Sequence, residues 1–289
     1  MLPRFELLMP ETLPEALDLL AGYAPDALPI AGGTNLVPDI RGGKRQPGAL
    51  VNVAGLEELQ EIRRENGHVV IGSGVKIADL LESDLIAEHA PCLREAAGMF
   101  ANPLVRNRAT VGGNLGNASP AADTAPPLLV LGAEVKLASK GESRWVDLSD
   151  FFLDVCDTVC RHVELITAIR WPVPSPKTFS RFRKLSLRKS TAISVVSVAM
   201  QLTLDDAGRC EDARIGLGAV APTPIRAREA EARLRGEALT PEVVEEVTRF
   251  GCDAASCIGD VRSSAAYRER VTEVLMRRLL QEAGVGSKE

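Results

Sequence analysis

The chain passes from a short apolar run into a pair of glycines at Ala27-Leu28-Pro29-Ile30-Ala31-Gly32-Gly33-Thr34-Asn35. The apolar half predicts a buried strand, and the glycines predict a turn with positive φ angles that lets a ligand approach the backbone. A second junction of this kind stands at Thr110-Val111-Gly112-Gly113-Asn114. One such loop is typical of an ordinary turn, whereas two could hold both halves of a diphosphate on their backbone N–H groups.

The familiar nucleotide-binding motifs do not account for these loops. Gly72-Ser73-Gly74 begins a dinucleotide fingerprint, but Ile77 occupies the position of its third glycine. Gly43-Lys44 does not form a P-loop, because Pro38 stands at the first glycine position and Arg45 at the Ser/Thr position. A site of the Rossmann or P-loop type is therefore disfavoured.

Outside the loops, the hydrophobic pattern predicts an α+β chain. A capping box at Thr12-Leu13-Pro14-Glu15 starts a first helix that ends near Gly22. Further helices are expected at 35–40, 79–88, 92–99, 224–235, 241–256 and 263–283. Strands are expected at 27–31, 50–53, 68–72 and 165–171, with an edge strand at Val135 and Leu137. Alternating apolar residues over 196–204 predict a half-buried antiparallel strand that turns at 205–208 and returns over 213–219.

The length of 289 residues suggests two domains, at roughly 150 residues per domain. Pro172-Val173-Pro174-Ser175-Pro176 reads as the linker between them, because repeated prolines continue neither a helix nor a strand. We expect one domain over residues 1–175, with lobes at about 1–55 and 56–175, and a second domain over 176–289.

Composition excludes several functional classes. Lys and Arg number 34 against 39 Asp and Glu, so a net charge of -5 gives no field for nucleic acid or anionic membranes. No apolar run approaches the roughly 18–20 residues of a membrane span. The N-terminus shows no secretory pattern, so we expect a cytoplasmic protein whose six cysteines are reduced thiols.

With their neighbours, the two junctions resemble the flavin loops of the FAD-binding medium subunits of molybdenum hydroxylases, the carbon monoxide, nicotinate, xanthine and 4-hydroxybenzoyl-CoA type enzymes. The resemblance covers nearly the whole chain, and its runs are residues 28–37, 107–115, 118–123, 182–189, 218–226 and 263–280. It implies a two-lobed FAD-binding domain of the PCMH type, similar to that of vanillyl-alcohol oxidase. A small C-terminal domain of antiparallel sheet and helices would follow.

The resemblance also implies which residues contact FAD. Two runs would hold the pyrophosphate: Ala31, Gly32, Gly33, Thr34 and Asn35, and the run from Thr110 to Asn114 with Gly112 and Gly113. Ile30 and Leu36 would also bind the cofactor. Asn117, Ser119 and Asp123 would contact the ribityl, ribose or diphosphate part, Phe100 and Ala101 would line the pocket, and Ile166 and Lys184 would lie beside the isoalloxazine. Plainer interpretations stay open for three of these residues: Ile166 as strand core, Lys184 as a solvated charge and Asp123 as a helix cap.

No metal site and no catalytic acid, base or nucleophile is expected. Cys156, Cys160 and His162 lack two further ligands nearby, so buried thiols are the better interpretation. The cysteine-bearing insertion of the 4-hydroxybenzoyl-CoA reductases is absent between Asn114 and Leu137. The basic stretch 268–278 is typical of an amphipathic helix, with a partner-docking surface as the alternative.

The resemblance therefore implies an oxidoreductase subunit that carries FAD for electron transfer between 2Fe–2S centres and NAD⁺ or another acceptor. The molybdopterin would lie on a large partner subunit and the 2Fe–2S clusters on a small one, in a heterotrimer that is doubled into a dimer. Two alternatives stay open. One is a stand-alone reductase similar to UDP-N-acetylenolpyruvoylglucosamine reductase, and the other is a non-catalytic assembly module that has lost FAD.

Overall fold

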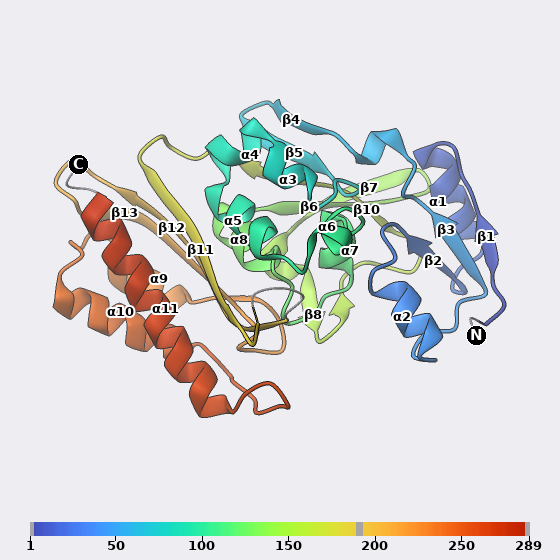
Figure 1. The fold of residues 1–289 in the computed structure, drawn as a ribbon. Helices are drawn as coiled ribbons and strands as arrows, with labels where there is room; N and C mark the ends of the chain where they lie inside the picture. Colours follow the sequence, from blue (N-terminus) through green and yellow to red (C-terminus); the bar gives the residue numbers. More distant parts are fainter. Residues whose placement is uncertain (1–2, 189–192, 287–289) are drawn as a thin grey trace.

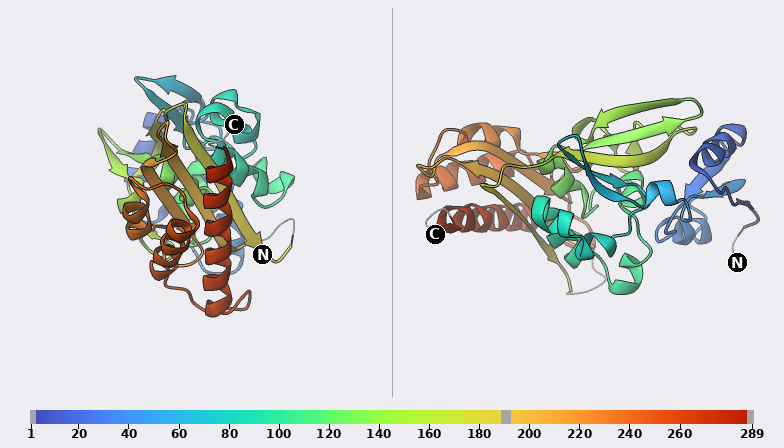
Figure 2. Two further views of the ribbon diagram at one scale, coloured as in Figure 1. Left: turned by 90° about the vertical axis from the view of Figure 1, so that its left-hand side faces the viewer. Right: turned by 90° about the horizontal axis from the view of Figure 1, so that it is seen from above.

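The computed structural model describes residues 3–188 and 193–286 of the chain. The molecule is elongated, with the N-terminal strands at one end, the C-terminal helices at the other and a central sheet between them (Figures 1 and 2). Each of these three parts has its own cluster of buried apolar side chains. Helices pack beside parallel and antiparallel sheets, which confirms the predicted α+β class.

The N-terminal part is a parallel three-stranded sheet in the order β1-β3-β2. Its strands and helices are β1 (Glu6–Leu8), α1 (Leu13–Gly22), β2 (Ala27–Ile30), α2 (Leu36–Arg41) and β3 (Ala49–Asn52). The predicted cap of α1 is confirmed, since Thr12 Oγ1 accepts a hydrogen bond from the Glu15 N–H at 3.3 Å. The Glu15 carboxylate accepts from the Glu11 N–H at 2.8 Å rather than from that of Thr12. This packing places the loop after β2 at the side that faces the central part.

The central part is an antiparallel five-stranded sheet in the order β4-β5-β10-β6-β7. Its strands are β4 (Ile62–Glu65), β5 (His68–Gly72), β6 (Glu134–Ser139), β7 (Glu142–Asp147) and β10 (Leu165–Pro172). The prediction of an edge strand at Val135 and Leu137 is wrong, because β6 lies between β10 and β7. Its polar positions are accommodated by neighbouring strands, as Glu134 shows by pairing with Arg170 at 2.7 Å.

Short helices cover this sheet. They are α3 (Asp79–Glu82), α4 (Asp84–His89), α5 (Pro91–Met99), α6 (Pro103–Arg106), α7 (Val111–Gly116) and α8 (Ala125–Leu131), with 3₁₀ turns at Glu57–Leu59 and Leu148–Asp150. The single helix expected over 79–88 is divided at Ser83, whose hydroxyl accepts from the Ile86 N–H and caps α4. A small hairpin of β8 (Phe152–Asp154) and β9 (Asp157–Thr158) projects beside them.

The C-terminal part is an antiparallel sheet in the order β11-β12-β13-β14 with three described helices. Its strands are β11 (Thr178–Ser186), β12 (Ser194–Leu204), β13 (Cys210–Gly218) and β14 (Ile225–Arg226), and its helices are α9 (Arg228–Leu234), α10 (Pro241–Asp253) and α11 (Ala265–Gly286). The antiparallel pairing predicted for β12 is confirmed, but the strand is not half-buried. Ala199 packs into the central cluster and Val198 into the C-terminal one, so both faces of β12 are covered.

The central and C-terminal parts share a continuous interface. Helix α8 packs against β12 and β13, and α5 lies along β11. The Glu95 carboxylate of α5 accepts a hydrogen bond from the Phe182 N–H of this edge strand at 2.7 Å. Among the described helices, none combines the length and the apolar character that crossing a membrane requires.

Candidate functional site

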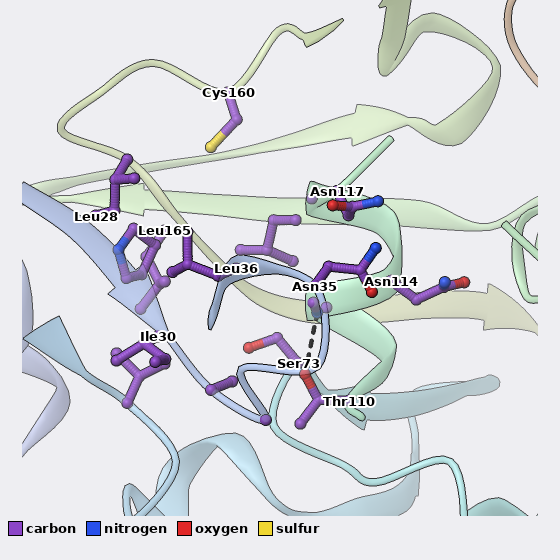
Figure 3. A pocket seen from close by; sticks show the side chains of 18 of the residues that line it. Leu28, Ile30, Asn35, Leu36, Ser73, Thr110, Asn114, Asn117, Cys160 and Leu165 are labelled. Carbon is purple, nitrogen blue, oxygen red and sulfur yellow. Dashed lines mark hydrogen bonds between the residues drawn. The ribbon is translucent and has the colours of Figure 1, made fainter. Parts of the chain in front are cut away.

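A cleft of about 340 Å³ lies between the N-terminal part and the central sheet. Three segments form its walls: residues 27–36, residues 109–117 and residues 156–166. Figure 3 shows aliphatic side chains from the first and third segments, with the amides of Asn35, Asn114 and Asn117 among the polar groups around the same cleft.

The first glycine loop presents free backbone donors to this cleft. Gly33 has a φ of +67°, which turns the chain from β2 toward α2. Within the described part of the chain, the N–H groups of residues 32–35 donate to no protein acceptor. The Asn35 side chain makes no capping hydrogen bond. Since backbone N–H groups are normally paired, this row of donors is suited to an anionic or carbonyl-rich ligand.

Close packing explains the other glycine of this loop. A Cβ atom at Gly32 would lie 1.9 Å from the Arg108 carbonyl oxygen. The Arg108 side chain also donates from Nε to the Gly32 carbonyl at 3.4 Å. The first loop therefore rests directly on the segment that leads into the second.

The second glycine pair has a different structure from the predicted one. No described strand precedes it, and neither glycine has a positive φ; Thr110 instead caps α7, with Oγ1 accepting from the Gly113 N–H at 3.0 Å. Ser73 and Val75 accept the N–H groups of Gly112 and Val111 at 2.9 Å each. The prediction of a second turn with free donors is wrong, because a neighbouring segment already pairs them.

Gly112 is required for packing in this region. A Cβ atom on it would lie 2.5 Å from the Ser73 Cβ atom and 2.8 Å from the Ser73 carbonyl oxygen. Only a glycine at position 112 therefore lets α7 pack this closely against the segment after β5.

The segment that contains the second glycine pair contributes side-chain amides to the cleft. Asn114 accepts at Oδ1 from the Thr124 hydroxyl at 2.6 Å and from the Thr124 N–H at 3.3 Å. This fixes the orientation of the amide and leaves Nδ2 without a partner among the described residues. Asn117, one turn later, also lines the cleft.

The structure brings most of the predicted site residues to this cleft. Those that line it are Ile30, Ala31, Gly32, Gly33, Thr34, Asn35, Leu36, Phe100, Thr110, Gly112, Gly113, Asn114, Asn117 and Ile166. Those that do not line it are Ala101, Ser119, Asp123 and Lys184. Ile166 is also part of the buried core of β10, which confirms the strand-core interpretation, and its contact with the isoalloxazine stays a prediction. Lys189, the last residue of one resembling run, lies outside the described residues.

Asp123 and Lys184 form a buried ion pair. Lys184 Nζ lies 2.7 Å from Asp123 Oδ2, and the Ser194 hydroxyl donates to Asp123 Oδ1 at 2.5 Å. Burial raises the pKa of Asp123, while Lys184 and Ser194 oppose that rise by stabilising the carboxylate. The helix-cap alternative for Asp123 is wrong because Thr124 occupies the N-cap. The alternative of a solvated Lys184 is also wrong, since only 4% of its side chain is exposed.

The third wall of the cleft, residues 156–166, was mostly missed by sequence reasoning. Glu164 is buried there and accepts two hydrogen bonds from Arg144, at 2.8 and 2.9 Å. Those hydrogen bonds hold the pKa of Glu164 below its ordinary value. Arg144 also donates to the Val159 carbonyl, which fixes the loop. No local pattern signals this wall, because its anchor comes from the distant strand β7.

The cysteines of this wall differ from one another. Cys156 is exposed, which corrects the prediction of a buried thiol, and its φ is +57°. Burial raises the pKa of Cys160 to about 11. Across residues 3–188 and 193–286, no group of three His, Cys, Asp or Glu side chains is arranged to hold a metal ion.

Comparison with known families places both halves of the chain. Residues 3–174 match the family described as "FAD binding domain in molybdopterin dehydrogenase". Residues 181–283 match the "CO dehydrogenase flavoprotein C-terminal domain".

Individual relatives match over almost their whole length. The carbon monoxide dehydrogenase medium chain of Afipia carboxidovorans is 32% identical, with 98% of each chain covered. The nicotinate dehydrogenase FAD-subunit of Eubacterium barkeri is 33% identical, with 95% of this chain and 94% of the relative covered. Among solved structures, a chain of a Cu,Mo-CO dehydrogenase superposes with a TM-score of 0.94 at 32% identity, with 99% of both chains covered. A chain of quinoline 2-oxidoreductase from Pseudomonas putida 86 gives a TM-score of 0.92 at 28% identity, with 100% of both chains covered.

Proposed function

The chain belongs to the FAD-binding subunits of the molybdenum hydroxylase family, and from this premise we propose that it relays electrons. In this proposal it takes them from 2Fe–2S centres on one partner chain and delivers them to NAD⁺ or another acceptor. A large molybdopterin-binding subunit and a small 2Fe–2S subunit complete a heterotrimer, which doubles into a dimer. Residues 1–175 form the FAD-binding domain, with lobes at about 1–55 and 56–175, and residues 176–289 form the C-terminal domain.

The residues of the cleft fit FAD. The observation that carries the proposal is the row of N–H groups at residues 32–35, which have no partner among the described residues. A diphosphate would supply the missing acceptors. The cleft, at about 340 Å³, lies within the roughly 300–1,000 Å³ typical of cofactor pockets. Its mixture of aliphatic walls and a few amides suits a flat, partly apolar cofactor with a charged middle.

Each wall of the cleft has its own task. The N–H groups of residues 32–35 bind the diphosphate, while the amides of Asn35, Asn114 and Asn117 orient it and the adjoining polyol. Leu36 and Leu165 exclude water from the apolar parts. When bound, FAD supplies the electron-transfer chemistry, and the protein supplies binding, orientation and local electrostatics.

The remaining four predicted contacts do not line the cleft. Asp123 and Lys184 form a buried pair of opposite charges, and Ser119 and Ala101 flank segments that line the cleft. We retain these four residues as proposed FAD contacts. Their side chains would reach the cofactor from the central and C-terminal parts of the chain.

The two alternatives predict other properties. A stand-alone reductase of the UDP-N-acetylenolpyruvoylglucosamine type would need a substrate pocket and a proton donor of its own within this chain. An assembly module without FAD would have no use for the unpartnered donors of the first loop. Turnover of a sugar nucleotide by the chain alone would support the first alternative, and a colourless chain that binds no added FAD would support the second.

The test is reconstitution. We expect about one FAD per chain, released by acid precipitation because the attachment is non-covalent. The chain alone should reduce a dye with NADH, if NAD is its acceptor, and should oxidise no hydroxylase substrate. Substrate-dependent dye reduction should appear only after the molybdenum and iron–sulfur subunits are added. Substrate turnover by the chain alone would contradict the electron-relay proposal.

A further inference from the structure

We infer that Arg268, on the last helix of the C-terminal part, is a positioning residue for the flavin site. The inference rests on the FAD-binding function proposed above. Arg268 does not line the cleft. It acts through backbone groups that hold the segment between the second glycine pair and α8.

Arg268 is buried, with 3% of its surface exposed, and its guanidinium connects three distant points. Nη1 donates to the carbonyls of Val195 and Ala219, the latter at 2.9 Å. Nη2 donates to Asp260 Oδ1 at 2.8 Å, and this carboxylate also accepts from the Arg262 and Ser263 N–H groups. Asp260 therefore fixes the plane of the guanidinium, and the guanidinium fixes the two carbonyls.

The first carbonyl leads to the buried ion pair. Val195 is the extra residue of a bulge between β11 and β12, so the regular pairing of these strands does not fix its backbone. Its neighbour Ser194 donates to Asp123, which pairs with Lys184. Holding Val195 therefore sets where the Ser194 hydroxyl meets the Asp123 carboxylate.

The second carbonyl leads to the segment behind Asn117. Ala219 has a φ of +63°, a conformation that costs energy for a residue with a Cβ atom and persists only where the surroundings enforce it. Its N–H donates to the Pro120 carbonyl at 2.8 Å. In the same segment, Ala118 has a φ of +46° and accepts from the N–H of the cleft residue Cys156 at 2.9 Å.

Both connections thus converge on residues 118–123, between the cleft residue Asn117 and the Thr124 that orients Asn114. Burying an arginine costs free energy, because its charge must be removed from water. Its Nε is buried without a partner among the described residues, which adds to that cost. The Val195 and Ala219 carbonyls explain why an apolar side chain would not serve, since they would lose their donor.

The experiment titrates FAD into the full-length apo chain by flavin fluorescence and records the visible circular dichroism of the bound cofactor. Arg268→Met should weaken FAD binding about tenfold, which corresponds to roughly 1.4 kcal/mol, and should change the dichroism. Arg268→Lys, which restores one charged donor, should recover part of both. Because Arg268→Met could prevent folding, Asp260→Asn is the second variant. It keeps the guanidinium but loosens its orientation, and it should shift both readouts in the same direction by a smaller factor.

Arg262→Gln is the matched control. Arg262 pairs with the same Asp260 carboxylate from a more exposed position and reaches neither carbonyl. This variant should keep the wild-type affinity and dichroism. A wild-type chain that binds no FAD would refute the proposed function, and the inference with it. A wild-type chain that binds FAD, beside Arg268 and Asp260 variants of unchanged affinity and dichroism, would overturn the inference alone.

Discussion

The two glycine pairs of this protein are each followed within two residues by an asparagine, but their structures differ. In the first, Gly33 adopts a positive φ and the following N–H groups have no protein partner in the described chain. In the second, Gly112 and Gly113 are helical, and acceptors on Ser73 and Thr110 take their N–H groups. One pair therefore presents unpaired N–H groups to the cleft, whereas the N–H groups of the other are hydrogen-bonded within the protein.

The comparison shows that a glycine pair followed by a nearby asparagine does not by itself specify backbone recognition of a ligand. Glycine is used for two physical reasons, access to the left-handed region and close approach. The first pair uses both, at Gly33 and Gly32, whereas the second uses only close approach, at Gly112. We therefore expect substitution of Gly33 to act mainly on FAD affinity and substitution of Gly112 to act mainly on the stability of the fold.

The largest effect on FAD binding is expected for Gly33→Val. A β-branched residue at a φ of +67° costs roughly 1–3 kcal/mol of backbone strain, and its Cβ atom would lie 3.2 Å from Val37. The loop should rearrange and misdirect its donors, so FAD affinity should fall at least about 100-fold, two factors of roughly 1.4 kcal/mol each. Calorimetric titration of the apo chain measures this.

Gly43→Val is the control for that variant. Gly43 also has a positive φ, of +76°, but it is exposed and a Cβ atom there would meet nothing within 4 Å. It should lower the melting temperature without changing FAD affinity. If purified Gly33→Val carried FAD at full stoichiometry, the assignment of the first loop to the diphosphate site would be wrong.

Gly112→Ala tests the packing role of the second glycine pair. The new Cβ atom would meet Ser73 at 2.5 Å, and overpacking of this kind costs about 1–3 kcal/mol. The free energy of unfolding in urea should fall by about that amount, while the folded fraction keeps most of its FAD affinity. Gly116→Ala is the matched helix variant, since its Cβ atom would make an ordinary 3.4 Å contact with Ile166. If Gly112→Ala lost FAD affinity at unchanged stability, the contrast between the two pairs would be wrong.

Asn114→Asp should weaken FAD binding less than Gly33→Val does. The substitution keeps the acceptor for Thr124 but replaces the free amide donor with a negative oxygen that repels a diphosphate. FAD affinity should fall about tenfold, or roughly 1.4 kcal/mol, with little change in the melting temperature. Asn102→Asp introduces the same charge at the cap of α6, outside the cleft, and should bind FAD normally. Equal affinity of both variants would exclude Asn114 from the diphosphate site.

Much of this molecule follows from local sequence patterns. The α1 cap, the strand before the first glycines and the antiparallel return after β12 depend on neighbouring residues, and the structure contains them. The motif residues of both loops do line one cleft. Glu164 and Arg268 could not be identified in this way, because their roles depend on partners contributed by distant segments.

The sequence by itself determined the α+β class, the position of the first loop and the family to which the chain belongs. These features arise from periodicity, backbone preference and motif spacing, which act over a few residues at a time. Only the tertiary structure decided that the N–H groups of the second glycine pair are hydrogen-bonded within the protein, that β6 is internal and that Asp123 contacts Lys184 and Ser194. The physical reason is that a hydrogen-bond donor is free or satisfied according to what lies opposite it, and here Ser73 and Val75 reach α7 only through the fold.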